Sequence, residues 1–217
     1  MTQALKKKKG VVLIRLLVVG TLLIAHGGTF ASGQTACSVT HTESKGARGD
    51  SGGNLLPGLI EERLSLMTDV ARTKWNNGSA IEDPVREQQL LADVGGKAQA
   101  LGLSADWAQH FFRLQIEAAK EIQYCLFAQW TAAGQKPFQE VQDLRTAIRP
   151  QLDRLTVQLL QELARQWPQL NSPGSPEQNA FRSAQSTNGI ATRLAVLPLS
   201  DGSLQAYRHV PAVGSRQ

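Results

Sequence analysis

The sequence predicts an all-α fold, a bundle of helices in which the first and third helices are long. Three observations lead to this prediction. Four stretches between residues 55 and 167 repeat apolar side chains at the period of an α-helix. Start and stop signals such as Asp-Pro, Asn-Gly and Gly-Leu-Ser separate these stretches. No strand-like alternating run of any length occurs before residue 190.

The first 31 residues are predicted to be a cleaved signal peptide. Lys6–Lys9 form a basic region, residues 11–25 are apolar except for Arg15, and residues 29–31 offer a small-residue cleavage site. The apolar run is short for a membrane span, although an uncleaved membrane anchor is the alternative. We therefore expect a periplasmic or secreted protein that has no membrane association after cleavage.

A helical domain is predicted over residues 55–170, after a polar, Gly/Ser/Thr-rich lead-in at residues 32–54 that is typical of a flexible segment. The four helices are expected at about residues 55–77, 83–101, 104–131 and 138–167. Pro150 predicts a kink or break at Arg149-Pro150 in the last of them. Residues 171–217 form a C-terminal extension in which only a short helix at residues 177–187 is expected.

The first expected helix carries two cations in the middle of its apolar face. Arg63 and Lys74 are eleven residues apart, about three helical turns, so their side chains point almost the same way. A buried cation without a partner costs several kcal/mol. Either this face stays in water or an anion comes to meet the two cations.

The other three expected helices also place polar groups on or beside their apolar faces. Glu87 projects into the face of the second helix with Arg86 at its edge, Gln123 lies in the centre of the third face, and Arg145 falls within the fourth. One such group is usually solvated or satisfied locally. Four helices with the same feature favour a shared cavity. Because arginine binds carboxylates bidentately, this cavity would suit a small dianion.

The charge balance and motif content exclude several function classes. Residues 1–31 hold five of the 23 Lys and Arg residues and no acidic residue, so the remainder has 18 basic and 18 acidic residues. This balance argues against nucleic acid or an anionic membrane as a partner. The four histidines are scattered, and no metal-ligand spacing, Gly-rich phosphate loop or nucleophile elbow occurs, so no metal is expected.

The two cysteines are expected to stay unpaired. Cys37 lies in the predicted flexible lead-in and Cys125 lies in the middle of an expected helix. A disulfide between them is the alternative, because an exported compartment permits one.

Three motifs resemble the all-helical chorismate mutases. The first is the combined spacing Arg63-x10-Lys74-x8-Asp83-x2-Arg86-Glu87, and the second is FFRxQIEAxKxIQ, which ends at Gln123. The third is LRxxIRPxLDRL at residues 144–155. Together with the predicted signal peptide, these motifs look like those of the secreted, gamma-class members. The resemblance covers about residues 55–167.

The resemblance implies the Claisen rearrangement of chorismate to prephenate, with no cofactor and no covalent intermediate. Arg63 would be catalytic together with Lys74, Glu87 and Gln123. Lys74 and Gln123 would donate to the ether oxygen, where negative charge grows as the C–O bond breaks. Glu87 would accept a hydrogen bond from the ring hydroxyl.

The resemblance also implies how the substrate is held. Arg63 and Arg145 would pair with its carboxylates, Arg86 would face a carboxylate or orient the site, and Asp83 would hold the loop and the substrate. Ala119 stands where the family commonly has Ser or Thr, so binding should be weaker by one hydrogen bond, about 1 kcal/mol.

Because Arg145 belongs to the same chain, each chain is expected to hold a complete site. The oligomeric state stays open, a homodimer included. One alternative function is an isochorismate pyruvate lyase on the same scaffold, and the other is a non-catalytic periplasmic binding protein for a small dicarboxylate or a partner helix.

Overall fold

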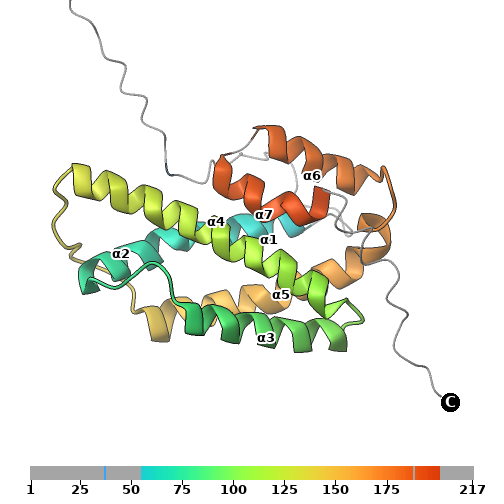
Figure 1. The fold of residues 1–217 in the computed structure, drawn as a ribbon, viewed down its shortest axis with the longest axis horizontal. Coiled ribbons are helices and arrows are strands. Elements are labelled where there is room, and N and C mark those ends of the chain that lie inside the picture. The colour runs from blue at the N-terminus through green and yellow to red at the C-terminus, as the bar shows by residue number, and fades with distance from the viewer. Residues whose placement is uncertain (1–36, 38–54, 188, 201–217) are drawn as a thin grey trace, which may run out of the picture. The chain divides into compact units, whose positions relative to one another are not determined.

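A computed structural model of the chain describes Cys37, residues 55–187 and residues 189–200 (Figure 1). The predicted signal peptide and nearly all of the predicted lead-in lie outside the described residues. Every regular element in the described part is helical, so the all-α prediction is confirmed. The elements are α1 (Leu56–Ser65), α2 (Met67–Asn77), α3 (Pro84–Ala100), α4 (Ala105–Ala132), the π-helical turn η1 (Leu144–Ile148), α5 (Arg149–Leu170), α6 (Pro176–Thr187) and α7 (Ile190–Ser200).

The predicted first helix is divided into α1 and α2 at Leu66. The Leu66 carbonyl accepts from the N–H groups of both Asp69 and Val70, each at 3.1 Å. α2 ends at Gly78, whose φ of +62° lets the chain reverse while the N–H of Ser79 bonds back to the Lys74 carbonyl at 2.9 Å. This reversal returns the chain toward α3.

α3 and α4 lie where the sequence predicts them and pack closely together. Asp83 caps α3 by accepting from the N–H of Arg86 (3.1 Å), and Ser104 caps α4 in the same way. α3 continues without interruption through Gly95. A Cβ at Gly95 would lie 2.6 Å from Nε2 of Gln109, so the glycine leaves room for the Gln109 amide, which donates to the Leu91 carbonyl at 3.1 Å.

The fourth predicted helix begins later than the sequence indicates. Phe138 is instead held outside any helix by Asn76 of α2, whose side-chain amide both donates to and accepts from the Phe138 backbone at 2.8 Å. The chain then makes the π-helical turn η1, and α5 begins at Arg149. The expected break at Arg149-Pro150 is therefore confirmed as a change of helix type.

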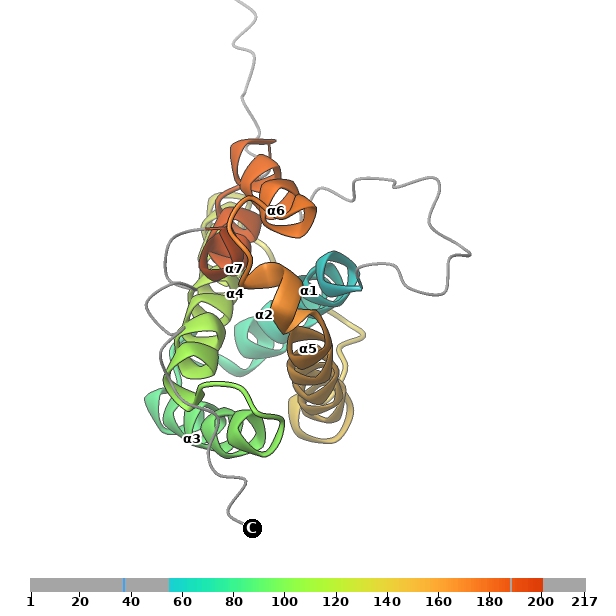
Figure 2. The same ribbon diagram turned by 90° about the vertical axis from the view of Figure 1, so that its right-hand side faces the viewer.

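The bundle core lies between α1, α4 and α5 and extends beneath the C-terminal helices (Figure 2). Its largest fully buried side chains are Trp107, Phe111, Phe112, Phe181, Leu56, Ile60, Leu64, Ile148, Leu155, Leu159, Leu160 and Leu163. None of the helices in the described part of the chain combines the length and the apolar character needed to cross a bilayer.

The described part of the C-terminal extension contributes to this core. α6 and α7 pack against each other, and α7 lies along α4 (Figures 1 and 2). Val196 and Leu199 of α7 are buried, and the buried Gln115 of α4 donates its side-chain amide to the Ala195 carbonyl at 2.7 Å. The expected helix at residues 177–187 is confirmed, and α7 occupies the region that the sequence left unassigned.

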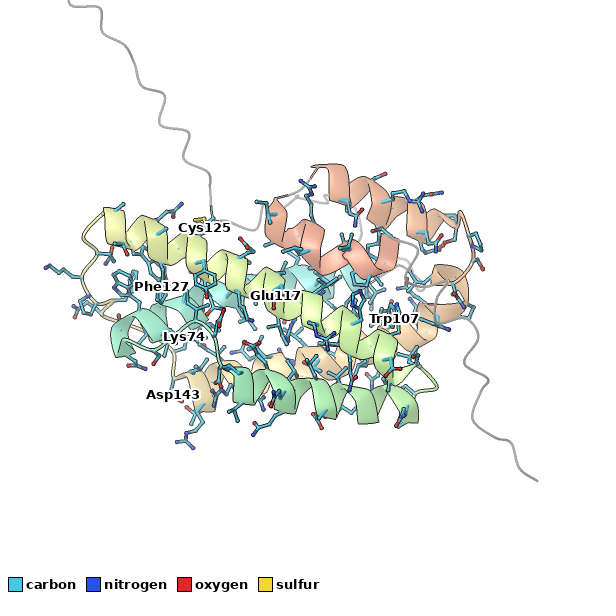
Figure 3. All side chains as sticks on the ribbon, in the orientation of Figure 1. Lys74, Trp107, Glu117, Cys125, Phe127 and Asp143 are labelled. Carbon is cyan, nitrogen blue, oxygen red and sulfur yellow. A yellow bond between two sulfur atoms is a disulfide. The ribbon has the colours of Figure 1, made fainter. Side chains whose placement is uncertain are left out.

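The prediction of unpaired cysteines is wrong, because Cys37 and Cys125 form a disulfide. Cys125 lies in the second half of α4 (Figure 3) and is half-buried rather than enclosed in the core. The two Cα atoms are 5.6 Å apart, a separation that a disulfide spans. A cysteine in the middle of a helix can form a disulfide when its side chain is not enclosed in the protein core.

The start of α1 depends on a carboxylate from α5. The N-cap residue of α1 is Leu55, which makes no side-chain capping hydrogen bond, and its N–H donates to Oε1 of Glu162 at 3.1 Å. Glu162 is buried and also accepts from Arg165 and Gln166. Hydrogen bonds from Arg165, then from Gln166 and Leu55, lower the pKa of Glu162 despite its burial.

We predict that Glu162→Gln lowers the free energy of unfolding at neutral pH by about 1–3 kcal/mol, because charge-assisted hydrogen bonds are lost. A lowered carboxyl pKa stabilises the fold above the ordinary glutamate value of 4.5, and this contribution is lost as the pH falls through the native value. Urea unfolding of the wild type and of Glu162→Gln at several pH values measures the difference in the free energy of unfolding. The exposed Glu121→Gln is the control, and a difference that persists unchanged at pH 2–3 would contradict the explanation.

Candidate active site

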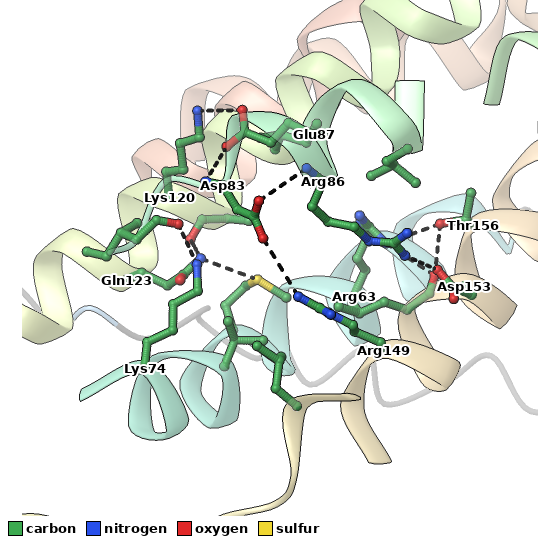
Figure 4. A pocket seen from close by; sticks show the side chains of 18 residues that line it. Arg63, Lys74, Asp83, Arg86, Glu87, Lys120, Gln123, Arg149, Asp153 and Thr156 are labelled. Carbon is green, nitrogen blue, oxygen red and sulfur yellow. Dashed lines mark hydrogen bonds and ion pairs between the residues drawn. The ribbon is translucent and has the colours of Figure 1, made fainter. Parts of the chain in front are cut away.

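One cavity of about 140 Å³ lies between α1–α2, α3, α4 and the η1–α5 segment (Figure 4). Six of the seven predicted site residues line it: Arg63, Lys74, Asp83, Arg86, Glu87 and Gln123. The other lining residues are Met67, Val70, Ile81, Leu90, Ile116, Ala119, Lys120, Leu144, Arg149, Leu152, Asp153 and Thr156. The polar groups that the sequence placed on separate helix faces therefore meet around one space.

The cavity carries an excess of two positive charges, since five cationic side chains and three carboxylates line it. Three of the cations are paired with the three carboxylates. The pairs are Lys120 with Glu87 (3.0 Å), Arg86 with Asp153 (2.9 Å) and Arg149 with Asp83 (3.7 Å). Among the described residues, Arg63 and Lys74 have no carboxylate partner. The uncompensated charge thus belongs to the two cations that the helical phase selects.

Arg63 is held in place without an ion pair. Its side chain is 5% exposed, its Nη1 donates to the Leu152 carbonyl (3.3 Å) and the Thr156 hydroxyl (3.4 Å), and its guanidinium lies 5.7 Å from the Phe112 ring centre. Burial lowers the pKa of Arg63 to about 10. The guanidinium is therefore still charged at neutral pH, and its Nε has no hydrogen-bond partner in the described structure.

Lys74 projects from the last turn of α2 into the space between α2 and α4 (Figures 3 and 4). Its Nζ donates to the Ile81 carbonyl. Burial lowers the pKa of Lys74, and the nearby carboxylates of Asp83 and Glu87 oppose this effect. The ammonium has three N–H groups, so it can donate to a ligand without leaving Ile81.

Gln123 lies beside Lys74 on the α4 wall and is 4% exposed (Figure 4). Its Nε2 donates to the Ala119 carbonyl (3.0 Å) and contacts the Met67 sulfur (3.9 Å). Thioether sulfur is a weak acceptor, so one N–H of Gln123 can turn to a stronger acceptor at little cost. Its Oε1 has no partner among the described residues.

The first turn of α3 fixes the two carboxylates beside Lys74. Asp83 is the N-cap of α3, and its backbone N–H donates to Oε1 of Glu87 at 3.3 Å. Pro84 supplies the first helical residue, which fits the fixed φ of proline. The Asp-Pro start that the sequence shows thus also sets the position of Asp83 and Glu87 in the cavity.

Arg145 does not line the cavity, and the prediction that it falls on the buried side is wrong. Arg145 lies in η1 and is exposed, whereas Arg149, the first residue of α5, lines the cavity. In η1 the N–H of Ile148 bonds to the Asp143 carbonyl, five residues earlier. A π-helical turn changes the angle between successive side chains, so the phase assumed for an α-helix fails here.

Four polar lining residues were not selected from the sequence: Lys120, Arg149, Asp153 and Thr156. Lys120 stands inside the motif FFRxQIEAxKxIQ, and Arg149 and Asp153 stand inside LRxxIRPxLDRL. The motifs therefore contained these three residues, but the sequence alone did not show which of the motif residues face the cavity.

Comparison with known proteins assigns this chain to a family. The chain matches the family described as chorismate mutase type II over residues 54–124. It is 31% identical over 153 residues to the secreted chorismate mutase of Yersinia pestis, covering 70% of this chain and 75% of that protein. This chain belongs to the chorismate mutase family.

Other chorismate mutases agree with this assignment. The secreted chorismate mutase of Mycolicibacterium smegmatis is 37% identical over 112 residues, which are 52% of this chain and 61% of that protein's length. The crystal structure of the chorismate mutase from Burkholderia thailandensis superposes with a TM-score of 0.57 at 36% identity, covering 71% of this chain and 96% of that chain. The resemblance seen in the sequence motifs is confirmed.

We predict that Arg149→Ala weakens binding of a dicarboxylate ligand by about 10–100-fold, because a charge-assisted contact at the cavity is removed. Arg145→Ala should change affinity by less than about twofold, because Arg145 is exposed outside the cavity. Isothermal titration calorimetry with the dicarboxylate substrate or product of the family measures both. Equal losses in the two variants would contradict the assignment of Arg149.

Proposed function

We propose that this protein is a chorismate mutase that isomerises chorismate to prephenate. The observation that carries the proposal is a pair of cations, the buried Arg63 and the half-buried Lys74, which lack carboxylate partners in the described structure and line a cavity with two excess positive charges. A dicarboxylate supplies the two missing negative charges. A small monoanion or a neutral ligand would leave at least one of these two cations uncompensated.

Binding contributes to the rate by fixing the reactive conformation. Arg63 and Arg149 lie on the α5 side of the cavity and would each pair with a substrate carboxylate, with Arg86 beside them (Figure 4). The Claisen rearrangement is intramolecular, so two anchored carboxylates hold the reacting ends close together. No nucleophile or proton transfer is required.

Electrostatic stabilisation supplies the second contribution. Lys74 and Gln123 lie side by side on the opposite wall and would donate to the ether oxygen as its bond to carbon breaks. Donors that are already held in position stabilise this growing charge without reorganisation. Glu87 would accept a hydrogen bond from the ring hydroxyl, and Asp83 would orient Lys74 and Arg149.

Every side chain to which the proposed reaction assigns a role, Arg149 included, belongs to this one chain. We therefore propose that each chain is active by itself, whether it is a monomer or part of a homodimer. The name of the Yersinia pestis relative supports export, and residues 1–31 fit a cleaved signal peptide, which favours a periplasmic or secreted enzyme.

We predict that the purified protein converts chorismate to prephenate far faster than the spontaneous rearrangement. Lys74→Ala should lower kcat by about 10²–10³-fold or more, as expected when one preorganised donor to the developing charge is removed. Loss of chorismate absorbance with product identification measures turnover. The exposed Lys136→Ala is the control and should behave like the wild type.

Isochorismate is tested in parallel. Salicylate and pyruvate from isochorismate, without turnover of chorismate, would replace the mutase by a lyase. Tight binding of chorismate without any reaction would replace it by a binding protein. Turnover that survives in Lys74→Ala would contradict the role of Lys74.

We also predict an alkaline limb in the pH profile of kcat/KM. Lys74 donates to the substrate only while it is protonated, and burial lowers its pKa below the ordinary lysine value of 10.5. Activity should therefore fall as the pH rises through this lowered value. Lys74→Arg, if active, should move the limb to higher pH, because arginine stays protonated where lysine does not. An alkaline limb at the same pH in the wild type and in Lys74→Arg would contradict this assignment.

A further inference from the structure

Lys120 is a cation of the cavity to which the family motifs assign no role. It lies on α4 between Ala119 and Gln123, and its side chain is only 14% exposed. Its Nζ lies 3.0 Å from Oε2 of Glu87 and 3.1 Å from Oε1 of Glu117 (Figure 4 shows the contact with Glu87). Glu117 is exposed on the same helix, whereas Glu87 comes from α3 and lines the cavity.

The two oxygens of Glu87 have different partners. Oε1 accepts from the backbone N–H of Asp83 at 3.3 Å, and Oε2 pairs with Lys120 at 3.0 Å. The first contact lies within the start of α3, and the second crosses from α3 to α4. Together they restrict rotation of the carboxylate, so its remaining acceptor positions keep a fixed direction.

Lys120 also contributes to the net charge of the cavity. With Lys120 present, Glu87 is compensated and the excess of two positive charges belongs to Arg63 and Lys74. Without it, the excess falls to one, and an unpaired carboxylate faces a dianionic substrate. Although burial alone would lower the pKa of Lys120, its ion pairs with Glu87 and Glu117 raise it, so the compensating charge is present throughout the neutral range.

We propose that Lys120 is a positioning residue that orients the Glu87 carboxylate and compensates its charge, so that Glu87 can contact a dianionic substrate. The proposal rests on the proposed chorismate mutase function and deepens it by adding a residue that acts through Glu87. A purely structural role would be a cross-link between α3 and α4 that affects stability alone.

The test compares kcat and KM for chorismate in the full chain and its Lys120→Met variant. We expect kcat/KM to fall about tenfold, mainly through KM, because the loss weakens binding of the dianion in ground and transition states alike. Lys120→Arg keeps the charge and should recover activity to within about threefold of the wild type. Thermal unfolding of the same samples reports any loss of stability.

Two control variants separate the cavity contact from its surroundings. Glu117→Gln removes the exposed partner of Lys120 and leaves Glu87 in place. Lys97→Met removes one positive charge from an exposed pair with Asp93 on α3. Both should keep kcat/KM within about twofold of the wild type.

A double-mutant cycle with Glu87→Gln tests whether Lys120 acts through Glu87. In the Glu87→Gln background, Lys120→Met should have less than about a twofold further effect on kcat/KM. Effects that multiply independently would overturn the proposal, because Lys120 would then act on the substrate directly. An unchanged kcat/KM in Lys120→Met would also overturn it.

The double-mutant cycle can still be measured if one variant is unstable. Should Lys120→Met fail to fold, Lys120→Gln keeps a polar side chain of similar length and replaces it throughout. A wild-type chain that does not convert chorismate would overturn both proposals. A fully active wild type with an unaffected Lys120 variant would overturn only the role of Lys120.

Discussion

The cavity is organised around two cations, the buried Arg63 and the half-buried Lys74, that no carboxylate of the described structure neutralises. Such burial is unfavourable unless hydrogen bonds hold the charges and a ligand compensates them. Backbone carbonyls and the Thr156 hydroxyl supply the hydrogen bonds. The lowered pKa values of both groups have this burial as their main cause.

Local turn and cap residues position the side chains around these two cations. Gly78 reverses the chain after α2, and Asp83 then starts α3, so Lys74, Asp83 and Glu87 meet within a short length of sequence. α4 supplies the opposite wall through Lys120 and Gln123. Because α7 covers another side of α4, the C-terminal extension helps to fix the helix that carries these residues.

Local periodicity was sufficient wherever a residue stays within one regular helix. Gln123 and Glu87 lie on the faces that the 3.6-residue period assigns them, and both reach the cavity. Periodicity failed across residues 133–149, where the Asn76 side chain holds Phe138 and a π-helical turn follows. The error in the start of the fourth helix and the choice of Arg145 over Arg149 have this common source.

The sequence by itself determined the all-α class and the caps of α3 and α4, since these follow from contacts within a few residues. Its helical phase also selected Arg63 and Lys74, which both line the cavity although the chain divides at Leu66 between them. Its motif spacing also indicated the family. Only the tertiary structure decided that Arg149 faces the cavity, that Cys37 pairs with Cys125, and that α7 packs on α4. These features depend on groups far apart in the sequence, whose meeting is set by the packing of the whole bundle rather than by local preference.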